Sequence, residues 1–335
     1  MSSITNITIH CSQFPENVHR DLLASLRTGE VNHKFHYDSV KQTQKWLALH
    51  ETYSPARTDP DCVMIYDRSF EAVAQRVKSK RVHVIGLGCG GGQKDGRLLK
   101  QLRNKGKEVF YTPSDVSTAM VLVARQSAME VVPEKSCVPL VCDLATASDL
   151  AEVIEQLAVP KAKRLITFFG MIPNFEPQVV LPRLSAFVRS DDMLLFSANL
   201  ALGRDYGEGL KRILPLYDNT LTRDWLMTFL LDLGVERRDG KMDFCIEDDP
   251  GGADLKRVAA YFRFRREREI TIEDKRFRFG PEKAIRLFFS YRHTPENVRS
   301  LLGAHGIEVV VQWITKSEEE GVFLCRRKPA SKYIT

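Results

Sequence analysis

Short apolar segments alternate with helical segments through the middle of the chain, and this alternation restricts the fold more than any other feature. Five segments have the pattern of buried strands, and stretches with helical periodicity separate them. The predicted strands are residues 81–88, 108–112, 137–141, 164–169 and 193–197, and the predicted helices are residues 94–103, 117–130, 146–157 and 178–188. Such an alternation predicts an α/β fold, a parallel sheet with helices on both faces.

The segments on either side of this region have a different rhythm. Residues 15–50 have helical periodicity, and a second helix is predicted to follow the proline-containing break at 53–59 and to reach about residue 77. Residues 204–235 are also predicted to be helical. Residues 257–290 alternate polar and apolar side chains around a turn at Asp274-Lys275, which is typical of antiparallel strands.

The last part of the chain resumes a sheet pattern. It contains a predicted helix at 295–305 and predicted strands at 307–314 and 321–326, which we expect to complete the first sheet. Two domains follow from this expectation. The first comprises residues 60–200 plus 292–330, and the second, residues 10–59 plus 201–291, is inserted into it and carries the substrate site.

Composition excludes several classes of protein. The 335 residues allow about two domains, and a net charge of +6 is too small to indicate a nucleic-acid partner. The basic residues between 263 and 278 are interleaved with acidic ones, as in a salt-bridged hairpin. No apolar run approaches the roughly 20 residues of a membrane span. Seven scattered cysteines without a CxxC pair favour reduced thiols in a cytoplasmic protein, and the histidines form no metal-binding pattern.

A glycine-rich loop between the first predicted strand and its helix is the strongest functional signal. The sequence VIGLGCGGGQK covers residues 84–94 and includes Gly86, Gly88, Gly90 and Lys94. Glycines let a ligand approach the backbone closely, and the following helix presents free N–H groups. The loop is compatible with a dinucleotide, a phosphate or the methionine part of S-adenosylmethionine (SAM), and also with a tight turn that binds nothing. No GxxxxGK[ST] motif is present, which excludes an NTPase P-loop.

Two acidic residues follow the next predicted strands. Asp115 comes after the second strand and Asp143 after the third, so both are expected at the same edge of the sheet as the loop. One carboxylate suits the two hydroxyls of a ribose and the other suits an adenine amino group. Either residue alone could cap a helix, and the spacing does not distinguish SAM from a nicotinamide dinucleotide.

The fourth predicted strand ends in a segment that contains Asn174. Substrates of open α/β sheets bind beyond the carboxyl ends of the strands, so Asn174 is expected where a substrate meets the cofactor. The alternative is a cap of the helix that follows Pro177.

These features together resemble the SAM-dependent histidine α-N-methyltransferases of ergothioneine biosynthesis and their wider family, which includes tryptophan-type amine methyltransferases. The similarity runs over nearly the whole chain. The matching segments, each with the family pattern in parentheses, are KFHYD at 34–38 (KFxYD), YSPARTD at 53–59 (YYPTRxE), GLGCG at 86–90 with Lys94 (ELGSG…K), YTPSDV at 111–116 (YxPxDV), CDL at 142–144 (GDF), FGMIPNF at 169–175 (FLGSTIGN), LYDN at 216–219 (AYDD) and FSYRH at 289–293 (xSxKF).

The resemblance implies a class I Rossmann-like methyltransferase with a seven-stranded sheet and an inserted α+β substrate domain, most often a monomer. SAM is then expected at Gly86, Gly88, Gly90, Lys94, Asp115, Asp143 and Leu144. A small-molecule amino acid or amine is expected at Tyr37, Tyr53, Ser54, Asn174, Tyr217, Ala260, Phe288 and Ser290. Among these, Asn174 and Tyr37 are the expected catalytic residues. Neither a nucleic acid, a membrane nor a metal is implied.

Departures from the family pattern bear on both ligands. Gly86 stands where the loop normally has an acid, Ser54 replaces a tyrosine, and the segment that ends at Asn174 is one residue shorter. Phe288 and Ala260 stand where the histidine enzymes have a glutamate and a methionine that embrace the imidazole. An apolar residue at 288 cannot accept an imidazole N–H, which favours an indole-like substrate. Two alternatives remain: a histidine methyltransferase, and a catalytically silent protein that binds SAM.

Overall fold

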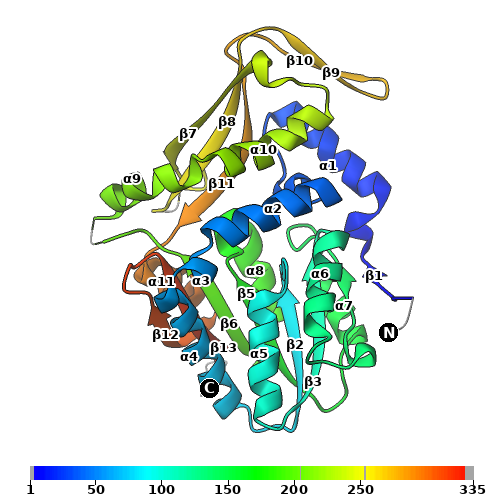
Figure 1. Ribbon diagram of the computed structural model, residues 1–335, viewed down its shortest axis with the longest axis vertical. Coiled ribbons are helices and arrows are strands. Elements are labelled where there is room, and N and C mark those ends of the chain that lie inside the picture. Colours follow the sequence, from blue (N-terminus) through cyan, green and yellow to red (C-terminus); the bar gives the residue numbers. More distant parts are fainter. Residues whose placement is uncertain (1–3, 204, 253, 329–335) are drawn as a thin grey trace, which may run out of the picture.

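The computed structural model describes residues 4–203, 205–252 and 254–328. Within these ranges, eight strands form one sheet in the order β1-β4-β3-β2-β5-β6-β13-β12 (Figure 1). Their bounds are β1 Thr8–Ile9, β2 Arg81–Leu87, β3 Glu108–Asp115, β4 Leu140–Val141, β5 Lys163–Phe169, β6 Met193–Asn199, β12 Ile307–Ile314 and β13 Glu320–Arg327. Neighbouring strands are parallel except at β13, which is antiparallel to both β6 and β12. The predicted α/β fold is therefore confirmed.

Helices cover both faces of this sheet, which explains why its strands are apolar along almost their whole length. On β2, Val82 and Val84 belong to one buried cluster, whereas Ile85 and Leu87 belong to the cluster on the other face. The helices of this part are α4 Pro60–Arg76, α5 Gln93–Asn104, α6 Thr118–Ala128, α7 Leu150–Gln156, α8 Pro177–Phe187 and α11 Pro295–Ala304, with the short 3-10 helices η3 Glu134–Ser136 and η4 Ile172–Asn174.

The strand order reverses beside β2. From β2 the chain proceeds outward through β3 and β4, and it then returns to β5 on the other side of β2. The loops that leave β2 and β5 therefore run in opposite directions, and a crevice opens between them at the carboxyl ends of the strands. The glycine-rich loop follows β2 at this place.

A second, antiparallel sheet lies above the first in Figure 1, and its order is β11-β8-β7. Its strands are β7 Gly240–Asp248, β8 Lys256–Phe264 and β11 Ala284–Arg292, and a separate hairpin joins β9 Arg268–Ile272 to β10 Lys275–Phe279. The helices around it are α1 Pro15–Thr28, α2 Val40–Tyr53, α3 Pro55–Thr58, α9 Tyr206–Tyr217 and α10 Thr220–Asp232, with η1 Cys11–Gln13, η2 His33–His36 and η5 Arg237–Asp239. Helix α2 lies between the two sheets (Figure 1).

Several boundaries differ from the prediction for local reasons. The expected helix over 15–50 is two helices, because Gly29 adopts φ +72° and ends α1, whereas Ser39 and Gln42 form a capping box that starts α2. The β9–β10 turn occupies residues 273–274, one position before the predicted turn. Strand β8 pairs with β7 and β11 and not with β10.

The two ends of the first sheet were predicted with different success. The C-terminal strands β13 and β12 join the sheet beside β6, as expected from their pattern. In contrast, β1 adds an eighth strand that the seven-stranded expectation did not include. Thr8 and Ile9 pair with β4, and two residues give no periodicity that a sequence can reveal.

The basic stretch around the β9–β10 hairpin is neutralised by acidic neighbours. Arg266 and Arg268 both donate to the buried carboxylate of Asp239. Burial alone would raise the pKa of Asp239, but donation from Arg268, the backbone of Glu236 and Arg266 holds it at about 2. Arg278 pairs with Glu269 at 2.9 Å. The predicted salt-bridged hairpin is thus confirmed.

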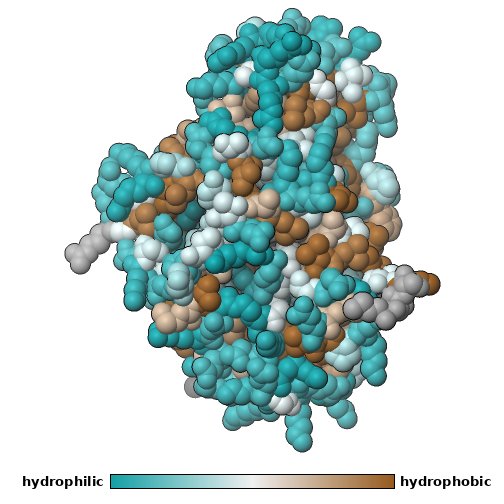
Figure 2. Space-filling model, in the orientation of Figure 1, coloured by the Kyte–Doolittle hydropathy of each residue, from teal (hydrophilic) through white to brown (hydrophobic). Residues whose placement is uncertain are grey.

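Apolar side chains are unevenly distributed over the face drawn in Figure 2. Figure 2 shows apolar side chains reaching this face mainly in a band across its middle, and the lower part of the face is mostly hydrophilic. Among the residues that the structure describes, no helix is both long and apolar enough to cross a bilayer. In the same ranges, no three histidine, cysteine or acidic side chains gather in a group that could hold a metal ion.

Candidate active site

One cavity of about 740 Å³ extends from the carboxyl ends of β2, β3 and β5 to strand β11 and helices α9 and α10. We call its two parts the loop end and the aromatic end. The loop end is lined by Gly88, Gly90, Lys94, Asp95, Asp115, Asp143 and Leu144. The aromatic end is lined by His33, Tyr37, Trp46, Asn174, Tyr217, Trp225, Phe288, Phe289, Ser290 and Arg292. Its size is typical of small-molecule sites.

The glycine loop leaves β2 in a conformation that only glycine adopts easily. Gly88, Gly90 and Gly92 have φ values of +64°, +50° and +72°. A Cβ atom on Gly90 would come within 3.1 Å of the indole of Trp46 on α2. Helix α2 therefore packs its indole directly on the loop, and the absence of side chains keeps the loop backbone accessible from the cavity.

Lys94 is held in place by the last strand of the first sheet. Its Nζ atom donates to the Tyr66 hydroxyl at 2.7 Å and to the Glu320 carboxylate at 3.2 Å. The Tyr66 hydroxyl donates to the same carboxylate. An ammonium has three donors, so one remains for an anionic group in the cavity.

Asp115 ends β3 and closes the loop from the other side. Its Oδ2 atom accepts the backbone N–H of Gly90 and its Oδ1 atom accepts that of Ser117, each at 3.1 Å. Burial raises the pKa of Asp115 to about 6, although these backbone donors oppose the rise. Each carboxylate oxygen retains a lone pair, which is the arrangement that accepts two vicinal hydroxyls.

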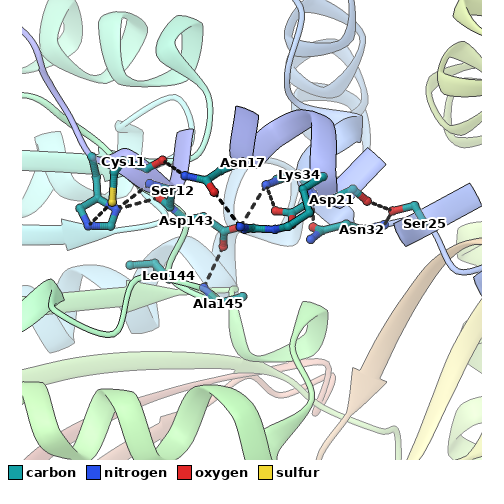
Figure 3. A network of polar contacts seen from close by, with 12 residues as sticks. Cys11, Ser12, Asn17, Asp21, Ser25, Asn32, Lys34, Asp143, Leu144 and Ala145 are labelled. Carbon is teal, nitrogen blue, oxygen red and sulfur yellow. Dashed lines mark hydrogen bonds and ion pairs between the residues drawn. The ribbon is translucent and has the colours of Figure 1, made fainter. Parts of the chain in front are cut away.

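Asp143 lies at the start of a polar network that reaches the N-terminal helix (Figure 3). Its backbone N–H donates to Ser12 Oγ at 3.0 Å, and its Oδ1 accepts the backbone N–H of Ala145 at 2.8 Å. The buried Lys34 ammonium lies 3.5 Å from Asp143 Oδ2 and also pairs with Asp21 on α1. Sequence reasoning quoted Lys34 as part of a motif but did not connect it with this carboxylate.

Two predicted site residues do not line the cavity. Gly86 lies inside β2, and a Cβ there would come within 2.4 Å of Asp95 Oδ2, so this position faces the side chain of Asp95. Ala260 on β8 is fully buried and pairs in register with Phe288 on β11. The larger Phe288 side chain lines the cavity at this place, and Ala260 does not.

Aromatic rings surround Phe288 at the aromatic end. The ring centroid of Phe288 lies 5.2 Å from His33, 5.9 Å from Trp225 and 6.0 Å from Tyr217. Tyr37 lies 5.5 Å from Trp225. These spacings are those of packed aromatic clusters, so the wall at position 288 is continuous and apolar.

Tyr217 and Ser290, which were both expected to bind the substrate, are in direct contact. The Tyr217 hydroxyl donates to Ser290 Oγ at 2.8 Å, and Arg292 Nε donates to the same hydroxyl at 3.1 Å. In the described part of the chain, the Arg292 guanidinium forms no ion pair, although it is buried and lines the cavity. Arg292 was missed as a site residue; its position two residues after Ser290, on the same strand face, was the available signal.

The other predicted residues occupy different depths. Asn174 ends η4 and is partly buried at the wall of the aromatic end. Burial and the neighbouring Asp115 raise the pKa of Tyr37, so its hydroxyl stays protonated and can donate. Tyr53 is 49% exposed and Ser54 partly exposed, which puts both at the rim.

His33 adds a polar group that the sequence did not indicate. Neither of its ring nitrogens has a hydrogen-bond partner within the described ranges, and its ring packs edge-on against Phe289 at 4.5 Å. Burial, with the nearby His36 and Arg286, lowers the pKa of His33 well below its ordinary value. The imidazole is therefore neutral and has one nitrogen that accepts and one that donates.

Comparison with known proteins identifies the family. A model of the family described as histidine-specific methyltransferase, SAM-dependent, matches residues 18–327, nearly the whole chain. The N-methyltransferase imqF of Aspergillus flavus is 24% identical over 281 residues, which cover 82% of this chain and 73% of that protein.

Solved structures with a similar chain path include other methyltransferases. The mitomycin 7-O-methyltransferase MmcR has a TM-score of 0.41 at 14% identity and covers 94% of this chain and 69% of its own. The methyltransferase CcbJ from Streptomyces caelestis has a TM-score of 0.42 at 12% identity, with 89% of this chain and 99% of its own chain covered.

The loop end suits the cofactor that the family uses. A free donor on Lys94 matches a carboxylate, and the Asp115 carboxylate matches ribose hydroxyls. SAM, when bound, supplies an electrophilic methyl group on its sulfonium. The chain therefore belongs to the family of SAM-dependent, histidine-specific methyltransferases, and it is an enzyme that uses S-adenosylmethionine as its cofactor.

Proposed function

We propose that this SAM-dependent N-methyltransferase acts on the amino group of a small amino acid or amine with an aromatic, indole-like side chain, in preference to histidine. The observation that carries the proposal is the apolar wall at Phe288. Its ring is enclosed by His33, Tyr217 and Trp225, where a histidine-binding site would need a hydrogen-bond acceptor.

The polar residues between the two ends support methyl transfer to a held amino acid. Arg292 offers a guanidinium without an ion-pair partner among the described residues, and Tyr217 and Ser290 extend it into a site for the substrate carboxylate. Tyr37 is the second hydroxyl that we assign to this carboxylate. Asn174 is our candidate for the amide that accepts an N–H of the substrate and orients the nitrogen lone pair.

The chemistry then requires little beyond alignment and a neutral nitrogen. Burial in the cavity lowers the pKa of an ammonium, so the substrate ammonium would release its proton to water as it binds. The residues named above would hold the neutral amine in line with the methyl group that SAM would supply, and this proximity would provide most of the rate. Repeated transfer is compatible with the volume of the cavity, about 740 Å³.

His33 offers an acceptor that either an indole N–H or an imidazole N–H could use, so the preference for an indole rests on the apolar ring of Phe288. A neutral imidazole nitrogen with no partner in the described residues can accept the N–H of an indole ring that packs on Phe288. An unpaired buried nitrogen is costly, and such a substrate would remove that cost.

Histidine is the second candidate substrate, and a separate observation at Glu176 supports it. One carboxylate oxygen of Glu176, Oε2, has no hydrogen-bond partner within the described ranges, and Glu176 lines the same cavity. It could accept an imidazole N–H in place of the glutamate that Phe288 replaces. The family description also names histidine.

We also propose the division of the chain that accompanies this function. Residues 60–200 plus 292–330 would form the methyltransferase core, and residues 10–59 plus 201–291 would form the substrate domain. The separate hydrophobic cluster around Trp225, Phe264 and Leu287 supports this division.

A competition assay tests the substrate. Purified protein, SAM, and an equimolar mixture of tryptophan, tyrosine, phenylalanine, histidine and tryptamine are incubated, and methylated products are measured by mass spectrometry. We expect methylated tryptophan or tryptamine and little methylated histidine. In Phe288→Glu, the tryptophan kcat/KM should fall about tenfold or more and the histidine value should rise, whereas the uncharged Phe288→Leu should keep the original preference.

Other outcomes have definite meanings. A wild-type preference for histidine would overturn the indole proposal in favour of the Glu176 alternative. No product from any amine, together with a higher melting temperature on addition of S-adenosylhomocysteine, would favour a silent SAM-binding protein over an enzyme for these substrates.

A further inference from the structure

Two adjacent residues of opposite charge begin helix α5, and both line the loop end of the cavity. Lys94 extends toward Glu320 and Tyr66, whereas Asp95 is 2% exposed and its carboxylate lies beside Gly86 of β2. The amino-acid part of SAM carries a carboxylate and an ammonium on one carbon. A neighbouring cation and anion are the complement of such a zwitterion.

Among the residues that the structure describes, neutral side chains alone donate hydrogen bonds to the Asp95 carboxylate. Thr167 donates to its Oδ1 at 2.8 Å, and Tyr111 donates to its Oδ2 at 2.6 Å. In residues 4–203, 205–252 and 254–328, Asp95 forms no ion pair with a lysine or arginine, since Lys94 pairs with Glu320. A buried carboxylate without a cationic partner is unfavourable, and both of its oxygens have lone pairs left.

The same carboxylate occupies the space that a side chain at position 86 would need. A Cβ atom on Gly86 would lie 2.4 Å from Asp95 Oδ2 and 3.2 Å from the Tyr111 hydroxyl. Gly86 is the position where the family pattern has an acid. Any side chain at position 86 would therefore require the Asp95 carboxylate to shift, and an acid at 86 would bring a carboxylate to the same region as Asp95.

We propose that Asp95 binds the ammonium of the cofactor's amino-acid part, while Lys94 binds its carboxylate. Asp95 would then supply, from the first turn of α5, the anion that position 86 lacks in this chain. The inference concerns the cofactor, so it does not depend on which amine is methylated.

Two ligands separate this role from a structural one. S-adenosylhomocysteine has the ammonium, and its deamino analogue has a hydrogen in its place but keeps the carboxylate. In Asp95→Asn, which preserves size and one acceptor, we expect the Kd for S-adenosylhomocysteine by calorimetry to rise on the order of 10- to 100-fold. The Kd for the deamino analogue should change less than about threefold.

Lys94→Met is the matched control. Because both ligands carry the carboxylate, this variant should weaken both by a similar factor. If Asp95→Asn also weakens both ligands equally, Asp95 only maintains the fold of the loop, and the proposal is wrong.

A relocation variant provides an independent test. Gly86→Glu alone should lower the melting temperature and weaken S-adenosylhomocysteine, because its side chain collides with Asp95. Gly86→Glu combined with Asp95→Thr should regain at least part of the affinity for S-adenosylhomocysteine relative to Asp95→Thr alone. A double variant that folds but binds no better than Asp95→Thr would overturn the exchange of positions.

Discussion

The loop end and the aromatic end of the cavity are built in different ways. At the loop end, the residues lie at or just after the carboxyl ends of β2, β3 and β4, which are parallel strands of one sheet, so the backbone itself brings Gly88, Lys94, Asp115 and Asp143 together. At the aromatic end, the side chains come from η2, α2, η4, α9, α10 and β11, and they meet only through packing. The positions of the first set of residues are tied to the topology of the sheet. A residue of the second set can be replaced without altering the sheet.

The largest expected effect comes from removing the charge of Asp115, which tests whether the two ends bind their ligands independently. In Asp115→Asn we expect the Kd for SAM to rise on the order of 100-fold, since two charge-assisted hydrogen bonds to the ribose are weakened. The amide also turns an N–H toward the backbone donor of Gly90 or Ser117. The amine KM at saturating SAM should stay within about twofold. A large change in that KM would mean that the two ends are not separable.

A smaller effect is expected at Arg292 and should concern the substrate alone. Arg292→Met should lower kcat/KM for tryptophan roughly 10- to 30-fold, because a buried guanidinium that binds the carboxylate is lost. Tryptamine, which has no carboxylate, serves as the control and should change less than threefold. The melting temperature must be measured as well, since Arg292 also donates to the Leu200 carbonyl at 3.2 Å. Equal losses for both amines would contradict the carboxylate assignment.

The smallest of these effects is a pH dependence confined to the loop end. The pKa of Asp115 is raised to about 6 without ligand, and ribose hydroxyls favour the ionised form, so binding must lower this pKa. Affinity is therefore full only above about pH 7, about twofold weaker at pH 6 and about tenfold weaker at pH 5. Calorimetry with S-adenosylhomocysteine from pH 5 to 8 measures it. The same decline in Asp115→Asn would assign it to another group.

The same contrast explains how much the sequence could predict. Apart from β1, the strands of the first sheet and the residues at their ends were predictable, because apolar patterns locate these strands and the ligand-binding edge follows from the topology. Lys34 and Glu320 were not predictable as parts of the loop end. Lys34 meets Asp143 across 109 positions of sequence, and no local pattern reports such a contact.

The aromatic end was predicted less completely, and for a physical reason. Tyr217 and Ser290 came from a family pattern, whereas Arg292 and His33 are identified only by what surrounds them. Ala260, in contrast, was expected at the substrate but does not line the cavity. It pairs with Phe288 across β8 and β11, and which of the two side chains reaches the cavity depends on their sizes and on the twist of the sheet.

The contact between Lys94 and Glu320 has a consequence for the synthesis of the protein. These residues are 226 positions apart, and Glu320 belongs to the last strand of the first sheet. A nascent chain on the ribosome displays the glycine loop long before β13 exists, and domains fold as their residues emerge. During that interval Lys94 has no carboxylate to hold it. The position that the Lys94 ammonium has in the folded protein can therefore form only after β13 has been synthesised.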